Sequence, residues 1–445
     1  MNTSLLPFAY LLPLGLLLTA LGSTPRDRLR ESLLAALVIT VASVVAYIGF
    51  GFALQFGGIG LSPTAPAGLV GLDKVWSPFP ASAGRWSFAG LEGFFGEADG
   101  VRSGLALVET LLLHRLPMAI AAGLIPVIAL GDRVQRVALI AAGIVSTAIV
   151  FPIVGAWVWG GGWLGLLGLN LNLGHGAIDA AGSGVVFFAS ACVAFVALRL
   201  FRHAEDAARP VPTLPMTHQP LLTLLGAVLF GAGWSAWIVG DPLLITRTDA
   251  SLTSVAATGL ISASTALIVV SAYIWLVTGR LQLLMAVRGW LAGWIAAGAA
   301  AWFIPLSSAS VIGAIAGSLF ILGRYTAEAR WRLNDRADVL ALSGAAGAWG
   351  LIALGVLADG AFGSGWNGVD VAQGVRGVLA SDPGQLTAQL AALAAIGALA
   401  VCVAALLLFP FALLTRRAPA VLPIPLETQP ALDTPAATPP HSQTS

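Results

Sequence analysis

Residues 252–277 read LTSVAATGLISASTALIVVSAYIWLV and contain no charged side chain. An α-helix rises about 1.5 Å per residue, so about 20 such residues cross the roughly 30 Å hydrocarbon core of a bilayer. A helix that is apolar on all sides has to be buried in a large core or in lipid. This run therefore predicts a membrane-spanning helix.

The composition of the whole chain agrees with that helix. Of 445 residues, 58% are hydrophobic and 10% are charged, and the mean hydropathy is +0.89. This is more apolar surface than a soluble core of ordinary proportions can bury. The 52 glycines fit closely packed membrane helices, where small residues let backbones approach. The net charge of +1 gives no indication of a nucleic acid partner.

Eleven runs are long enough to cross a membrane. They lie at approximately 5–22, 32–56, 104–130, 134–158, 176–200, 219–240, 252–277, 282–302, 308–324, 338–358 and 385–414. We therefore expect an all-α integral membrane protein with one transmembrane domain, residues 1–414. Residues 57–103 form a Gly/Pro/Trp-rich loop, and residues 415–445 form a Pro/Thr-rich tail that we expect to be disordered.

Basic residues predict the orientation, because loops rich in arginine and lysine resist translocation. Of the 22 basic residues, fifteen lie on one side of the predicted spans and five on the other, and Arg115 and Arg288 lie inside spans. The side with fifteen is predicted to be cytoplasmic, in a plasma or inner membrane. An odd number of crossings then places the N-terminus and the 57–103 loop outside and the C-terminus in the cytoplasm.

Two other features concern processing and metal binding. Three arginines, at 26, 28 and 30, follow the first apolar run rather than precede it, so we expect a retained first helix rather than a cleaved leader. The two cysteines, Cys192 and Cys402, lie inside apolar runs, which leaves no disulfide framework and no four-ligand metal site. No cofactor is expected.

Six short segments, taken in order, carry a resemblance to a known family. They are 157–162 (WVWGGG), 176–182 (GAIDAAG), 225–237 (LGAVLFGAGWSAW), 279–293 (GRLQLLMAVRGWLAG), 312–317 (IGAIAG) and 338–344 (DVLALSG). Their order and spacing resemble the ammonium transporter (Amt/Mep/Rh) family. The resemblance implies two inverted five-helix repeats around a pore, an eleventh helix that straps them, an N-out and C-in topology, and a homotrimer with one pore per subunit.

The resemblance breaks down in the middle of the pore. Family transporters carry two adjacent histidines there, one on the fifth and one on the tenth helix, which offer hydrogen bonds to a small polar solute. The corresponding positions here are Phe187 and Ser343. The five histidines of this chain lie near span ends or in loops, at positions 114, 175, 203, 218 and 441. The pore would be lined by an aromatic ring and a hydroxyl, or blocked by Phe187.

The outer vestibule is also altered. By alignment, the two phenylalanines of the family's gate become Met118 and Trp237, its cation-binding tryptophan is kept as Trp159, and its serine becomes Asp241. Two indole rings and a carboxylate can attract a cation. Arg115 lies one turn from the gate position, and by pairing with the aspartate it would cancel that charge.

Three further charges lie along the predicted pore. Asp179 and Asp338 open the fifth and tenth helices, where a carboxylate that caps backbone amides is structural, although proton handling by Asp179 stays open. Arg288 lies two turns inside the eighth run, where it either snorkels to the interface or obstructs the inner vestibule together with Asp338. Neither Ser183 nor Ser343 has a His or Lys base at helical spacing, so we expect no enzyme activity.

These features leave more than one function open. The first is transport of ammonium or ammonia, with the cation recruited at Trp159, Trp237 and Asp241 and passed by Phe187 and Ser343. The second is a non-conducting sensor or pseudo-transporter, and the third is a channel for another small neutral solute. The tail lacks the pattern through which PII-type proteins control family members, so such a partner is not expected.

Overall fold

The structure is a computed structural model that describes residues 3–24, 26–82, 84–97, 105–131, 134, 136–201, 219–243, 252–335 and 337–417. In this part of the chain, nine helices are long and apolar enough to cross a membrane, and two shorter apolar helices are Leu6–Leu21 and Leu283–Ala297. The prediction of an all-α multi-pass membrane protein is thereby confirmed. Residues 418–445 of the predicted tail lie outside the described residues.

The helices up to residue 200, apart from the short α8, correspond to predicted spans one to five. They are α1 (Leu6–Ala9), α2 (Leu11–Leu21), α3 (Arg26–Ala46), α4 (Phe52–Phe56), α5 (Leu105–Leu130), α6 (Arg136–Ile144), α7 (Phe151–Val158), the short α8 (Leu167–Leu171) and α9 (Ala189–Leu200). Short π-helical segments join α3 to α4 and α6 to α7, and a third, Ser183–Phe188, leads into α9. Spans two, four and five are therefore continuous helices with a local widening of the turn.

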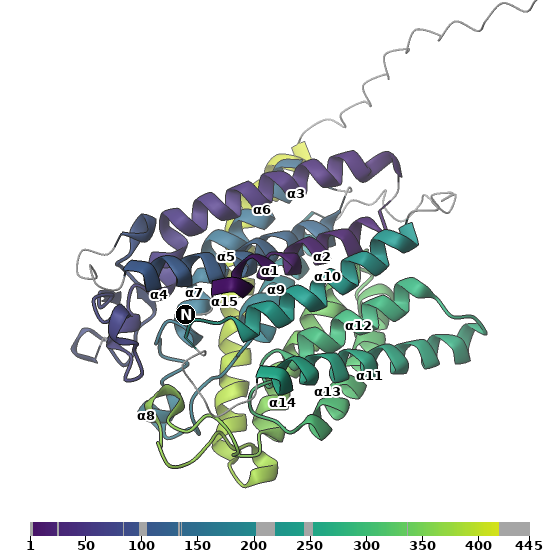
Figure 1. Cartoon of the computed structure of the whole chain (residues 1–445). Coiled ribbons are helices and arrows are strands. Elements are labelled where there is room, and N and C mark those ends of the chain that lie inside the picture. Colours follow the sequence, from purple (N-terminus) through teal and green to yellow (C-terminus); the bar gives the residue numbers. More distant parts are fainter. Residues whose placement is uncertain are drawn as a thin grey trace, which may run out of the picture.

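The remaining helices correspond to spans six to eleven. They are α10 (Gln219–Val239), α11 (Leu252–Thr278), α12 (Leu283–Ala297), α13 (Leu306–Tyr325), α14 (Ala346–Leu357), which follows a π-helical segment at Leu340–Ala345, and α15 (Pro383–Arg417). Helix α15 packs against α6, α9 and α14, and Figure 1 shows it crossing the other helices. It has the place of the predicted strap.

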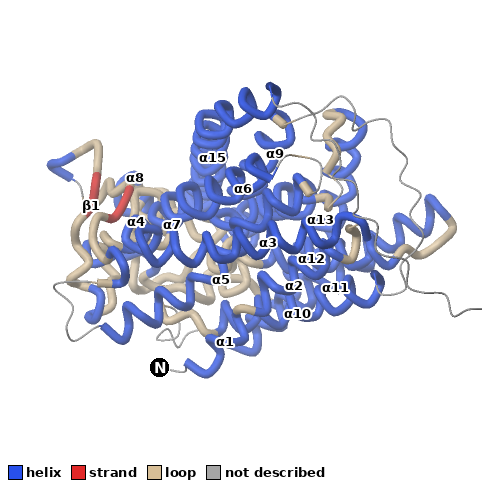
Figure 2. Tube along the Cα trace, turned by 90° about the horizontal axis from the view of Figure 1, so that it is seen from above, coloured by secondary structure: helices blue, strands red, loops and turns tan. Residues whose placement is uncertain are grey.

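Loops gather at one end of the bundle, which we call the loop end. The strands β1 (Val75–Trp76) and β2 (Ala89–Gly90) pair antiparallel there, near α8 (Figures 1 and 2). Trp163 connects this segment to the bundle, because its ring stacks on Phe88 at 5.5 Å and lies 5.5 Å from Trp157. Aromatic packing thus attaches the long loop to the end of α7.

Glycine lets the first and sixth spans touch backbone to backbone. A Cβ added at Gly15 of α2 would lie 2.5 Å from the carbonyl oxygen of Gly226 in α10, and one added at Gly226 would lie 2.5 Å from the amide nitrogen of Thr19. Neither position has room for a side chain. Close approach of this kind gives dispersion contacts between the helices. In lipid these contacts hold helices together, because the hydrophobic effect does not drive helix association there.

Two predicted spans begin or end differently in the structure. The fifth helix begins at Ser183 rather than 176, and the eighth ends at Ala297 rather than 302. The two irregular segments bond to each other: the Ala181 amide donates to the Gly298 carbonyl at 2.9 Å, and the Ala299 amide donates to the Ser183 hydroxyl at 2.8 Å. These hydrogen bonds between the two segments satisfy backbone groups that would be paired within the helix if either helix were longer.

Candidate functional site

A cavity of about 760 Å³ opens at the loop end of the bundle. Its lining residues come from the 57–97 loop, α5, the end of α7, the segment before α9, the segment after α10 and the loop after α14. They include Arg115, Trp159, Asp179 and Asp241. Charged and aromatic groups from widely separated parts of the chain thus meet at one place.

Arg115 and Asp241 form a buried ion pair at this cavity. Arg115 Nη2 lies 2.8 Å from Oδ2 and 3.1 Å from Oδ1 of Asp241, and the two residues are 1% and 2% exposed. The Leu243 amide donates to the same carboxylate at 2.9 Å. The aspartate proposed as a cation attractor is therefore already paired with a cation of this chain.

Aromatic rings surround the guanidinium of that pair. Its Cζ atom lies 4.8 Å from the Trp159 ring centroid, 4.9 Å from that of Trp237 and 5.7 Å from that of Phe56. These distances are those of cation–π contacts. We refer to Phe56, Trp159, Trp237 and Asp241 together as the cation cage. Of these four residues, Phe56 is the one that the sequence analysis did not select.

His114 fixes the position of one cage wall. Its Nε2 lies 2.8 Å from the carbonyl oxygen of Trp237, and the Trp237 indole N–H donates to the His114 carbonyl at 2.8 Å. The two rings also stack, with centroids 5.0 Å apart. His114 belongs to α5, which also carries Arg115. Trp237 belongs to α10, which ends shortly before Asp241, so this reciprocal contact joins the two helices that supply the ion pair.

Asp179 caps the π-helical start of the fifth span. Its carboxylate accepts the amides of Ser183, Gly184 and Val185 at 2.8 to 2.9 Å, and its carbonyl accepts the Trp159 indole N–H at 2.6 Å. Asp179 thus fixes the start of the fifth span through its carboxylate and the Trp159 ring through its backbone carbonyl. These contacts agree with the structural reading of the residue.

Phe187, Ser343 and Met118 do not line the 760 Å³ cavity. Phe187 and Met118 are fully buried, and the Phe187 ring lies 6.0 Å from that of Phe230. The Ser343 hydroxyl is buried and has no hydrogen-bond partner within the described part of the chain, and it lines a cavity of about 20 Å³ together with Arg288. The residues at the family's histidine positions thus lie on π-helical segments of the fifth and tenth spans.

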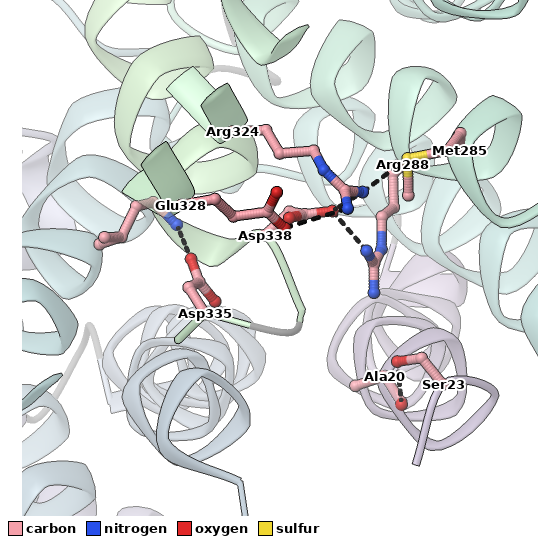
Figure 3. A network of polar contacts seen from close by, with 9 residues as sticks. Ala20, Ser23, Met285, Arg288, Arg324, Glu328, Asp335 and Asp338 are labelled. Carbon is pink, nitrogen blue, oxygen red and sulfur yellow. Dashed lines mark hydrogen bonds and ion pairs between the residues drawn. The ribbon is translucent and has the colours of Figure 1, made fainter. Parts of the chain in front are cut away.

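A second charge network, with Arg288 and Asp338 as its buried members, lies around Asp338 (Figure 3). Its carboxylate accepts hydrogen bonds from Arg288 Nη1 and, at 3.2 Å, from Arg324 Nη1, and Arg324 also contacts Glu328 at 3.0 Å. Arg288 is 4% exposed, so it does not snorkel into solvent and is instead paired inside the protein. Arg288 is thus paired with Asp338, and its predicted obstruction of the inner vestibule stays a prediction.

The reading of Asp338 as a helix cap is wrong in detail. The carboxylate that accepts an amide at the start of the tenth span, that of Leu340 at 2.7 Å, belongs to Asp335. Asp338 itself has a φ of 53°, a left-handed conformation that is uncommon outside glycine, and turns its side chain to the arginines. Burial raises the pKa of the Asp335 carboxyl to about 6, against the lowering effect of the Leu340 amide.

A sequence model of the ammonium transporter family, described as "Ammonium Transporter Family", matches residues 5–427 of this chain. The chain belongs to the ammonium transporter family.

Named relatives agree with that membership. Ammonium transporter Amt2 of Archaeoglobus fulgidus is 35% identical over 228 residues, which cover 49% of this chain and 47% of the relative, so this match spans about half the length of that relative. Ammonium transporter Amt1 of the same organism is 30% identical over 340 residues, 72% of this chain and 78% of the relative. A solved structure described as a Sensor Amt Protein is similar in fold, with a TM-score of 0.72 at 21% identity, covering 93% of this chain and 91% of that chain.

Two buried glutamines of this family member were not predicted from the sequence as residues of the site. Gln385 and Gln389 lie one turn apart on α15, are fully buried, and reach the segment that precedes Asp179. Gln385 accepts the His175 amide and donates to the Gly176 carbonyl, and Gln389 accepts the Ile178 amide and donates to its carbonyl, all at 2.7 to 2.8 Å. Two side-chain amides four residues apart in the apolar run 385–414 could have indicated buried polar contacts on this helix.

Proposed function

We propose that the protein moves ammonium or ammonia across the membrane that contains it. Family membership over residues 5–427 supports the substrate class. The single structural observation that carries the proposal is the 760 Å³ cavity at the loop end, which leads to a cluster of aromatic rings and a carboxylate of the kind that contacts nitrogen cations, here turned to Arg115. The same observation gives no support to catalysis.

The proposed path runs from the cation cage inward past Met118, Phe187 and Ser343. It lacks the paired imidazoles of the family, so the only polar group at these positions is the Ser343 hydroxyl. Because that hydroxyl is buried without a partner in the described residues, it is available to a small solute that gives or accepts a hydrogen bond. Passage requires the Phe187 ring to move away from Phe230.

The arrangement in the cell is part of the proposal. The distribution of basic residues supports a plasma or inner membrane with the loop end outside and the C-terminus in the cytoplasm. Residues 1–414 then form the transmembrane domain, with loop 57–103 external and residues 415–445 as a cytoplasmic tail. We also propose a homotrimer, by family resemblance, and no PII-type partner. Mass measurement of the purified protein in detergent would test the trimer.

The experiment is an ammonium concentration jump on proteoliposomes, read as a change of internal pH. The natural protein is compared with Phe187→His/Ser343→His, which restores both imidazoles. Phe188→His/Ser343→His is the matched control, because Phe188 packs against Gly397 of α15 rather than against Phe230. Transport by the natural protein supports the proposal.

The other outcomes separate the alternatives. A silent natural protein with activity only in Phe187→His/Ser343→His would mean that the scaffold is intact and conduction has been lost, as expected of a non-conducting sensor. Movement of small neutral solutes such as urea, without movement of ammonium, would identify a channel for another substrate.

A further inference from the structure

The cation cage already holds a cation, the side chain of Arg115. The guanidinium lies within 5 Å of both indole centroids and donates to both oxygens of Asp241 from one nitrogen. These are the contacts that a bound ammonium or guanidinium ion would make with the same groups. The side chain thus stands in for a ligand, attached to α5 by its own backbone.

The way in which the guanidinium is held supports this reading. Arg115 is 1% exposed, yet its Nε and Nη1 atoms have no hydrogen-bond partner among the described residues. An arginine retained only for a buried salt bridge is normally satisfied at most of its five N–H groups. Here three aromatic faces take the place of those acceptors, so the site is built to surround a planar cation.

A second cation cannot share this cage. The carboxylate is neutralised by Arg115 and accepts the Leu243 amide as well, so it offers no net negative charge to an arriving ion. A cation a few ångströms from the guanidinium would be repelled, and low dielectric strengthens that repulsion. An uncharged molecule of the same size is not repelled by the guanidinium and does not need a negative charge to bind.

We propose that Arg115 is an intramolecular occupant of the cation cage, which excludes external cations, so that ammonia rather than ammonium passes this point. The proposal rests on the proposed function for its transported species, but the occupancy of the cage does not. Removal of the Arg115 side chain is expected to leave an empty site that can bind a guanidinium ion. This site is formed by Phe56, Trp159, Trp237 and Asp241.

Binding is tested on the purified protein in detergent, with methylguanidinium as the probe and sodium at equal ionic strength as the reference. We expect millimolar methylguanidinium to raise the thermal unfolding midpoint of Arg115→Ala in a saturable way and to leave that of the natural protein unchanged. Arg115→Gln, which keeps a donor for Asp241, is the second variant if the alanine protein does not fold. Arg115→Ala/Trp159→Leu is the matched control, with at least tenfold weaker binding.

Two binding results would overturn the proposal. One is equal stabilisation of the natural protein and the folded variants by methylguanidinium. The other is a folded Arg115→Ala or Arg115→Gln protein that shows no saturable response, because the cage would then not be a cation site.

Transport is tested separately, by recording membrane current and internal pH together after an ammonium jump. We expect the natural protein to change internal pH without current, and Arg115→Gln to add a current. A natural protein that carries as much current per ammonium as the variant contradicts the exclusion of cations. If neither protein transports anything, the proposed function fails, whereas cage occupancy is still decided by the binding measurement.

Discussion

At the scale of single residues, Arg115 and Asp241 are 1% and 2% exposed, and neither charge is solvated by bulk water. Such a pair is asymmetric in its energetics. Loss of one partner leaves an uncompensated buried charge, whereas loss of both can be almost neutral if the replacement packs well. The same argument applies to Asp338, which has two arginines for partners and therefore keeps one when the other is removed.

Single and double substitutions separate these contributions. We expect Asp241→Ala to lower the free energy of unfolding in detergent by about 3–5 kcal/mol, because Arg115 is then buried without a counter-charge. Arg115→Met/Asp241→Leu is expected to recover most of that loss. Denaturation followed by near-UV circular dichroism measures both. A double variant as unstable as the single one would contradict this account of the pair.

At the scale of helices, the segment before Asp179 depends on a helix far away in the chain. Residues 174–178 run as irregular backbone, and α15 supplies the amides of Gln385 and Gln389 to their N–H and C=O groups. Irregular backbone is tolerated at membrane depth only where the protein itself satisfies those groups. The strap therefore acts on the site, since Asp179 in turn holds Trp159.

Gln389→Leu tests this dependence. It leaves the N–H and C=O groups of Ile178 without the side-chain partner that they now share, at an expected cost of about 1–3 kcal/mol in stability. Thr387→Val on the same helix is the control, because it removes an exposed hydroxyl that bonds only within α15. Thermal unfolding midpoints in detergent compare the two, and equal midpoints would exclude a role of Gln389 in holding the loop.

At the scale of the whole molecule, the two halves of the chain meet in the contact of α2 with α10. Gly15 and Gly226 face each other across it without room for a Cβ atom. Because the two backbones are already in contact, a displacement of one helix requires the other half of the chain to move with it.

Gly15→Ala is expected to lower stability by about 1–3 kcal/mol, since its methyl group would lie 2.5 Å from a backbone oxygen that cannot turn aside. Gly49→Ala serves as the control, because a Cβ there meets only the edge of the Phe95 ring at 3.7 Å. Unfolding midpoints of both variants in detergent check the prediction. A Gly15→Ala protein as stable as the control would show that the contact can open.

The sequence predicted the order of the spans because hydrophobic length is a local property that each run displays by itself. It also suggested that Arg115 would pair with Asp241, since both charges fell at pore positions. It missed Phe56 in the cage, Asp335 as the helix cap and Gln385 on the strap. Each of these acts through a partner brought near by the fold, and nothing in its own neighbourhood in the chain indicates that partner.

The spacing of the Arg115 pair also has a consequence for biosynthesis. Asp241 follows Arg115 by 126 residues, which at about 5–20 residues per second takes a ribosome roughly 6 to 25 seconds to add. During that time α5 reaches the membrane with an unpaired cation, at a cost of about 2.5–3.5 kcal/mol that its apolar neighbours must outweigh. Arg288 likewise precedes Asp338, by 50 residues. In both pairs the arginine is made first, and the nascent helix must be held until its aspartate arrives.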